Sequence, residues 1–171
     1  GRRLVSQCGI FEYEGRFIMI TDAAINIAPD VETQIGIVEN ALPVARALGV
    51  ECPKVAVLSA VENVTDKMPS TVTAREIAER GVEGCVISGP LALDGAISME
   101  SVKHKAIKDP VAGQADILLV PFIEIGNVLY KACSYIAGKT MASTICGASC
   151  PVIITSRADT PDSKYYSILM A

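Results

Sequence analysis

The sequence has 171 residues, a formal net charge of −4 and a hydrophobic content of one half, which is ample for a packed core and excludes a disordered chain. An acidic chain has no overall attraction for nucleic acid, which binds basic surfaces. No run of about 18 apolar residues occurs, so no membrane span is predicted. Aromatic residues are scarce and small aliphatic residues abundant, which favours buried parallel strands under closely packed helices.

The first predicted elements are a strand and a long helix. The apolar run Arg16–Thr21 predicts a strand. A helix is expected from Val31 to Leu48, with Asp30 as its N-cap and Gly49 as its stop. Pro43 lies inside this helix and is expected to kink or divide it.

Short apolar runs then alternate with helical segments to the end of the chain. Further strands are expected at residues 54–59, 84–88, 116–120 and 152–155. Helices are expected at residues 73–80, 99–105 and 124–137. Strands of four to six apolar residues separated by helices are typical of parallel βαβ units. The predicted fold class is therefore α/β with a parallel sheet.

Candidate binding residues follow the strands, because ligands of open parallel sheets bind beyond the carboxyl ends of the strands. These positions are rich in hydroxyl groups and small side chains: Thr21, Asp22, Asn26, Ser59, Ala60, Ser88, Gly89, Pro90, Pro121, Thr155, Ser156 and Arg157. An arginine offers a planar fork of donors to phosphate, so Ser156 and Arg157 are the leading candidates for an anion site. The alternative for Asp22 and Asn26 is a turn held by Asx hydrogen bonds.

Several other kinds of site find no support in the sequence. The phosphate-binding loop G-x-x-x-x-G-K-[ST], the dinucleotide motif G-x-G-x-x-G and the nucleophile elbow G-x-S-x-G do not occur. Six cysteines form no C-x-x-C pair, and the single histidine, His104, lies in a charged stretch. No metal site is therefore predicted, and free thiols fit a reducing cytoplasm.

Four strings are specific enough to compare with a known family. Residues 21–29 read T-D-A-A-I-N-I-A-P, residues 88–98 contain G-P-L-A-L-D, residues 110–131 contain P-V-A-G-Q-A-D-I-L and G-N-V-L-Y-K, and residues 155–159 form a Ser-Arg turn. In this order they resemble segments of the phosphate acetyl/butyryltransferases. The G-P-L-A-L-D string is most similar to the butyryl branch.

The resemblance implies an architecture and a reaction. Family members have two α/β domains with a cleft between them, in the isocitrate/isopropylmalate dehydrogenase-like fold, and are usually homodimers. Residues 17–139 would form most of the second domain, and residues 1–16 and 140–171 would be parts of a discontinuous, apparently incomplete first domain. The implied reaction transfers a butyryl or acetyl group between coenzyme A and phosphate, with no metal or redox cofactor. The family also uses an upstream arginine in the cleft, and neither Arg2 nor Arg3 is assigned to that role.

The resemblance also implies roles for individual residues. Arg157 would bind phosphate, Ser156 would donate to the departing sulfur or the oxyanion, and an aspartate would orient the nucleophile or act as base. Asp159 and Asp162 both fit the last role, and Asp162 is favoured. The expected substrate-binding residues are Asp22, Asn26, Gly89, Pro90, Asn127, Lys131 and Thr155. For Asn127, a packing or capping role is an equal alternative.

Three other functions remain open on the sequence. Some phosphotransacetylase-like domains sense acyl-CoA without transferring the acyl group, and this chain could be one of them. An enzyme of related fold that uses acyl phosphate in lipid synthesis is a second alternative, against which the strings at residues 21–29 and 88–98 argue. A fragment that serves only folding or dimerisation is the third.

Overall fold

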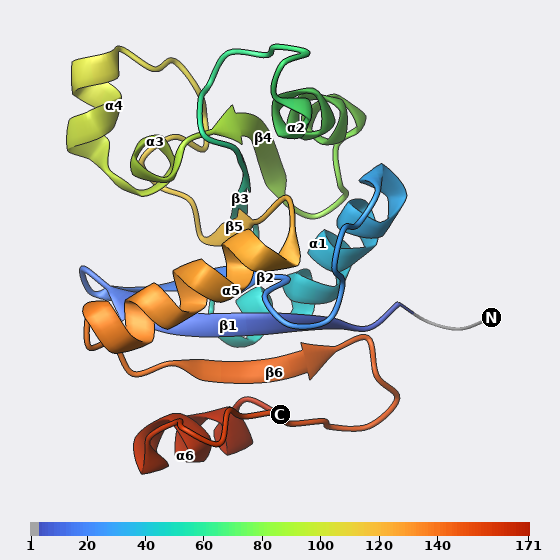
Figure 1. Cartoon of the computed structure of the whole chain (residues 1–171), viewed down its shortest axis with the longest axis vertical. Helices are drawn as coiled ribbons and strands as arrows, with labels where there is room; N and C mark the ends of the chain where they lie inside the picture. Colours follow the sequence, from blue (N-terminus) through green and yellow to red (C-terminus); the bar gives the residue numbers. More distant parts are fainter. Residues whose placement is uncertain (1–3) are drawn as a thin grey trace.

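The computed structural model describes residues 4–171, so the expectations for Arg2 and Arg3 lie outside the described residues. The strands are β1 (Ser6–Tyr13), β2 (Arg16–Thr21), β3 (Lys54–Leu58), β4 (Val86–Leu91), β5 (Ile117–Leu119) and β6 (Ala142–Cys146). The helices are α1 (Val31–Ala47), α2 (Pro69–Arg80), α3 (Leu93–Ile97), α4 (Met99–Lys105), α5 (Ile123–Lys131), the π-helical turn η1 (Ala132–Ile136) and α6 (Pro161–Leu169). Figure 1 shows the helices arranged around one central sheet.

The sheet is mixed and mostly parallel, which confirms the predicted α/β class. Its strand order is β4-β3-β5-β2-β1-β6. Strands β4, β3, β5 and β2 run parallel, whereas β1 is antiparallel to both β2 and β6. The carboxyl ends of the parallel strands therefore meet at one edge of the sheet, as the βαβ pattern predicts.

Each face of the sheet supports its own core, because neighbouring residues on a strand point to opposite faces. Ile117 and Leu119 of β5 pack with Ile37 and Val38 of α1 on one face. Leu118 packs on the other face, in a cluster that α5 covers through Leu129 and Tyr130. Helix α5 is thus fixed against the sheet.

The prediction of a strand at residues 152–155 is wrong. The segment is extended but belongs to no strand, and β6 lies about ten residues earlier. The segment runs beside β6, where the Ile145 N–H donates to the Val152 carbonyl at 3.1 Å. Its two isoleucines are exposed, Ile153 to 38% and Ile154 to 58%. Apolar content alone produced the prediction, whereas β6 carries Ser143 and Thr144 and does not read as an apolar run.

Other boundaries differ in ways that have local causes. Helix α1 runs unbroken through Pro43. Proline has no N–H group to donate to the carbonyl four residues earlier, but Pro43 lies on the exposed side of the helix, where water can bind that carbonyl instead. Helix α2 begins four residues before the predicted start, with Pro69 in its first turn. Strand β4 continues to Leu91 and includes Gly89 and Pro90. Strand β1 was not predicted, because Ser, Gln, Cys and Gly at its start do not form an apolar run.

Gly126 allows the close approach of α5 to the loop after β2. A methyl group on Gly126 would lie 2.7 Å from the Asp22 carbonyl oxygen and 2.9 Å from the Ala23 Cα atom. Because these are backbone atoms, they cannot swing aside. We expect Gly126→Ala to lower the free energy of unfolding by about 1–3 kcal/mol, the usual cost of overpacking.

Denaturant unfolding measures this loss. Val128→Ala is the matched control, because Val128 lies on the same helix and is 67% exposed. Its effect should remain within about 0.5 kcal/mol. An unchanged or raised unfolding midpoint for Gly126→Ala would contradict the proposed close packing of α5.

Candidate functional site

The Ser-Arg turn is held together by its own hydrogen bonds. The Ser156 N–H donates to the Asp159 carboxylate at 2.7 Å, and the Asp159 N–H donates to the Ser156 carbonyl at 3.1 Å. The Ala158 N–H donates to the Ser156 hydroxyl at 3.3 Å. Arg157 is exposed at the tip. The turn therefore holds a hydroxyl group and a carboxylate close together, with the exposed Arg157 next to Ser156 in the chain.

A small cavity lies behind this turn and is called here the Ser156 cavity. Its volume is about 260 Å³. It is lined by Gln7, Ala23, Ala24, Asn127, Tyr130, Lys131, Ser143, Ile154, Thr155, Ser156 and Asp159. These residues come from β1, the loop after β2, α5, β6 and the Ser-Arg segment. The structure thus brings together four of the predicted residues: Asn127, Lys131, Thr155 and Ser156.

Helix α5 presents two predicted residues to the cavity from one face. Asn127 and Lys131 are four residues apart and therefore neighbours on the helix surface. The Asn127 side chain donates to the Ala23 carbonyl at 3.4 Å. The Lys131 ammonium lies 6.0 Å from the centre of the Tyr135 ring. Lys131 gives the cavity a cation that an anionic substrate can contact.

Asp22 and Asn26 are not among the residues that line the cavity, but they hold the loop that supplies Ala23 and Ala24 to its wall. Asp22 is buried, and its carboxylate accepts the N–H groups of Ala24 (2.9 Å), Ile25 (3.1 Å) and Asn26 (3.1 Å). The Asn26 side chain donates to the same carboxylate at 2.6 Å and to the Val5 carbonyl at 2.9 Å. These hydrogen bonds form an Asx-type turn, which was the alternative to ligand binding for Asp22 and Asn26.

Gly89 and Pro90 lie apart from the Ser156 cavity, on β4 at the other end of the sheet. A methyl group on Gly89 would lie 2.8 Å from the Val57 Cβ atom and 2.9 Å from the Val57 carbonyl oxygen. Gly89 therefore permits close packing of β4 against β3. A separate apolar groove of about 490 Å³ opens at the nearby carboxyl ends, where Ser59 and Pro121 contribute to its wall.

Two aspartates compete for the acidic role, and the structure places them differently. Asp159 lines the cavity and binds the Ser156 N–H. Asp162 is exposed in the first turn of α6, after the N-cap Thr160. A carboxylate at that position stabilises the helix dipole. The two roles could not be separated from sequence because the start of α6 was not predicted.

Tyr130, Ser143 and Gln7 belong to the cavity but were not singled out from the sequence. The Tyr130 ring packs on Gly9, where a methyl group would lie 2.6 Å from the ring atoms Cδ2 and Cε2. Burial raises the pKa of Tyr130 to about 12, with a further increase from the negative charge of Asp159 and an opposing contribution from a hydrogen bond with Ser143. Tyr130 is therefore a neutral hydroxyl donor across the physiological pH range.

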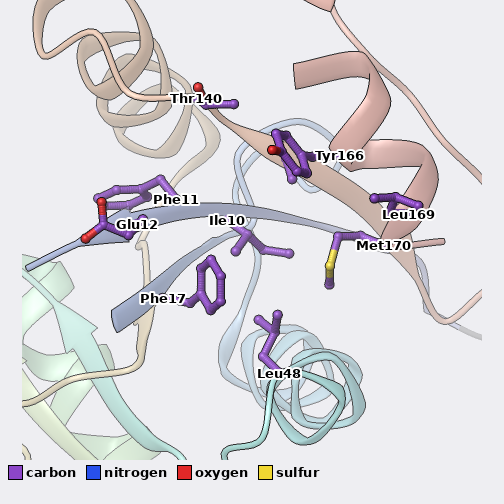
Figure 2. Close-up of a pocket in the computed structure, with 10 residues that line it drawn as sticks. Ile10, Phe11, Glu12, Phe17, Leu48, Thr140, Tyr166, Leu169 and Met170 are labelled. Carbon is purple, nitrogen blue, oxygen red and sulfur yellow. The ribbon is translucent and has the colours of Figure 1, made fainter. Parts of the chain in front are cut away.

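A second cavity, shown in Figure 2, lies between the sheet and α6. Its volume is about 390 Å³, and its wall includes Ile10, Phe17, Leu48, Tyr166 and Met170. These side chains offer almost no donors to an anion. The Ser156 cavity, with its lysine, hydroxyl and amide groups, is the better candidate for a phosphate-containing ligand.

The six cysteines are free thiols: Cys8 and Cys146 are buried, Cys85 and Cys133 are half-buried, and Cys52 and Cys150 are exposed. Burial raises the pKa of Cys8, and it raises the pKa of Cys146 to about 11. Both thiols thus remain protonated at neutral pH. Within residues 4–171, no cluster of three or more His, Cys, Asp or Glu side chains could hold a metal ion. Over the same residues, no helix is long and apolar enough to cross a membrane.

Comparison with known proteins defines the class. The family model described as "Phosphate acetyl/butaryl transferase" matches residues 1–171, and the chain belongs to this family. It is 49% identical over 160 residues to a probable phosphate butyryltransferase of Bacillus subtilis, covering 91% of this chain and 54% of the relative. It is 44% identical over 160 residues to a phosphate acetyltransferase of Thermotoga maritima, with the same coverage of 91% and 54%. The chain thus spans about half the length of these relatives.

Solved structures agree with the sequence comparison. A branched-chain phosphotransacylase from Enterococcus faecalis superimposes with a TM-score of 0.93 at 42% identity, covering 100% of this chain and 63% of that one. A 4-hydroxythreonine-4-phosphate dehydrogenase from Klebsiella pneumoniae superimposes with a TM-score of 0.52 at 11% identity, covering 96% and 54%. The second likeness shows a shared fold only.

The raised pKa of Tyr130 has a measurable consequence at alkaline pH. Its contribution to stability is fully present below the ordinary tyrosine pKa of 10.0 and is lost as the pH rises toward about 12. We expect the wild-type protein to lose stability relative to the Tyr130→Phe variant across that window. Denaturant unfolding of both proteins, from neutral pH to about pH 12, measures the difference. A difference that does not change with pH would contradict the burial of the hydroxyl group.

Proposed function

We propose that this chain carries the catalytic turn of an enzyme that exchanges a butyryl or acetyl group between coenzyme A and inorganic phosphate. The observation that carries the proposal is the arrangement of Ser156 and Asp159 around one cavity with Lys131, beside the exposed Arg157. Relatives named for both butyryl and acetyl transfer support the reaction class. Coenzyme A is a substrate in this proposal, and no cofactor is invoked.

The proposed reaction is a direct transfer. A phosphate oxygen attacks the thioester carbonyl carbon, a new C–O bond forms, the C–S bond breaks, and the thiolate takes up a proton as coenzyme A leaves. Arg157 and Lys131 hold the phosphate and offset the developing charge, and preorganised donors of this kind often make the largest catalytic contribution. Ser156 donates to the oxyanion or the departing sulfur. Holding the two anionic substrates in contact supplies much of the remaining acceleration.

We assign the role of orienting the nucleophile or acting as base to Asp159, and not to Asp162, which the resemblance to the family favoured. Asp159 lies at the cavity wall, whereas Asp162 faces solvent at the start of α6. From its position, Asp159 can orient the attacking phosphate or accept its proton. Thr155 and Asn127 complete the polar wall. The proposal includes no covalent acyl-enzyme, so it gives the cysteines no role.

The proposal extends to the architecture and assembly. The chain would form parts of a two-domain, isocitrate/isopropylmalate dehydrogenase-like enzyme that is a cytoplasmic homodimer. Residues 17–139 would belong to the second domain, with residues 1–16 and 140–171 in a discontinuous first domain. Under this division the two domains would share one sheet, because β1 pairs with β2 and β6 pairs with β1.

The contribution of Arg157 can be measured directly. In the full-length protein, Arg157→Ala is expected to cost about 2.7–4 kcal/mol of transition-state stabilisation, a hundredfold or more in kcat, because one preorganised donor is lost. The measurement is phosphate-dependent thiol release from butyryl-CoA and acetyl-CoA. Arg75→Ala is the matched control, since Arg75 is exposed on α2 and pairs only with Glu79 at 3.8 Å among the salt bridges of the described residues.

Two results would count against the proposal. Unchanged kcat in the Arg157→Ala variant would remove Arg157 from the site. Tight acyl-CoA binding by the wild-type protein with no phosphate-dependent thiol release would favour the acyl-CoA-sensing alternative.

A matched pair of variants separates the two aspartates. We expect Asp159→Asn to lower kcat by about 10²–10⁴-fold, the range for loss of a general base, because the amide cannot accept the proton. Asp162→Asn should leave kcat within about twofold, since it changes only a charge at a helix end. The same thiol-release assay measures both. The reverse order of effects would restore Asp162 to the acidic role.

A further inference from the structure

Gln7 is the one residue of the Ser156 cavity with an unsatisfied buried group. Its side chain is 5% exposed, and its Oε1 atom is buried without a hydrogen-bond donor among the described residues. No other buried side-chain nitrogen or oxygen in residues 4–171 is left in this state. A buried acceptor without a partner destabilises the folded protein, so such groups in native proteins are rare and often functional.

The position of Gln7 is firmly fixed by its backbone. It lies on β1 opposite Ile145 of β6, and its carbonyl accepts the Thr21 hydroxyl at 2.9 Å. Its Nε2 atom would lie 3.6 Å from a methyl group on Gly9, the residue on which the Tyr130 ring packs. The amide is therefore held beside Tyr130, on the wall of the cavity that also contains Ser156. Rotation about its last bond lets it present either oxygen or nitrogen.

A ligand that satisfies this amide needs a hydrogen-bond donor close to its reacting atom. Acyl phosphate carries no such donor when fully ionised, and a thioester group carries none. The flexible arm of coenzyme A ends in a secondary amide separated from the sulfur by two carbon atoms. Its N–H and C=O groups match the acceptor and donor of a glutamine side chain. Since Ser156 and Gln7 share a cavity of about 260 Å³, a sulfur at Ser156 would bring this amide toward Gln7.

We propose that Gln7 is a substrate-positioning residue that binds the amide of coenzyme A nearest the sulfur, and so holds the thioester carbonyl toward the phosphate. This inference rests on the proposed function. It gives the unsatisfied acceptor a partner that is present only when substrate is bound. The apolar side chains of Ala23, Ala24 and Ile154 also line the cavity and offer the substrate amide no competing hydrogen-bond partner.

The test compares two small thioesters that differ only in this amide. One is S-butyryl-N-acetylcysteamine, and the other replaces its amide N–H by an ester oxygen. With phosphate as the acceptor, the full-length wild-type protein is expected to prefer the amide by about tenfold or more in kcat/KM, because the ester leaves the Gln7 oxygen unpaired. In the Gln7→Leu variant the preference is expected to fall to about one.

A second readout separates positioning from a structural role. Because Gln7→Leu removes an unsatisfied buried acceptor, its Tm is expected to equal or exceed that of the wild-type protein. The control is Gln34→Leu. Gln34 of α1 is also buried, but its side-chain amide donates to the Pro29 carbonyl at 3.1 Å. This control should lower Tm and leave the amide preference unchanged.

The inference can fail independently of the proposed function. Equal amide preference in the wild-type and Gln7→Leu proteins would overturn it, as would a Gln7→Leu variant that raises only the KM for phosphate. Equilibrium binding of the two thioesters without phosphate covers the case of a protein that transfers no acyl group. There, wild-type preference for the amide that is lost in Gln7→Leu supports the role of Gln7, and equal binding overturns it.

Discussion

The close approach of α5 to the sheet is the constraint on which the Ser156 cavity depends. Two glycines permit it: Gly126 of the helix against the backbone of Asp22 and Ala23, and Gly9 of β1 beneath the Tyr130 ring. With these contacts made, the next residues on the helix face, Asn127 and Lys131, are brought to the cavity wall. This part of the cavity wall is thus set by the packing of backbone atoms.

The loop after β2 completes this arrangement through a single buried carboxylate. Asp22 accepts hydrogen bonds from three backbone N–H groups and the Asn26 amide, so the loop that receives α5 is held by its own hydrogen bonds. The family string at residues 21–29 therefore marks a structural support of the site. A string can be characteristic of a family because it builds the wall of a site, without any of its side chains touching substrate.

Charge in the molecule is organised locally. The chain carries a net charge of −4, yet Lys131 lines the cavity, and the exposed Arg157 follows Ser156 in the chain. Asp159 is tied to the Ser156 N–H, and Tyr130 stays neutral because burial raises its pKa. The remaining wall consists of amide and hydroxyl groups. Such a wall offers hydrogen bonds to neutral groups, and Lys131 adds a positive charge that can attract an anion.

The sequence predicted elements well where burial and apolar content coincide. Strands β2, β3 and β5 and helix α1 are buried runs or amphipathic segments with clear ends, and the structure contains all of them. Strands β1 and β6 were missed because both carry buried polar residues such as Gln7 and Ser143. The segment at 152–155 was overpredicted because its apolar residues, among them Ile154, remain exposed.

The same physical cause limited prediction of the site. Four residues could be predicted because they lie in strings that resemble the family: Asn127, Lys131, Thr155 and Ser156. Gln7 could not be predicted, because what distinguishes it is a buried side-chain oxygen without a hydrogen-bond donor, and a sequence does not show that. Gln7 and Ser143 are polar residues inside β1 and β6, and both line the Ser156 cavity. Two of the missed cavity residues, Gln7 and Ser143, therefore lie on the two missed strands, because a polar residue buried in a sheet interrupts the apolar pattern from which a strand is predicted.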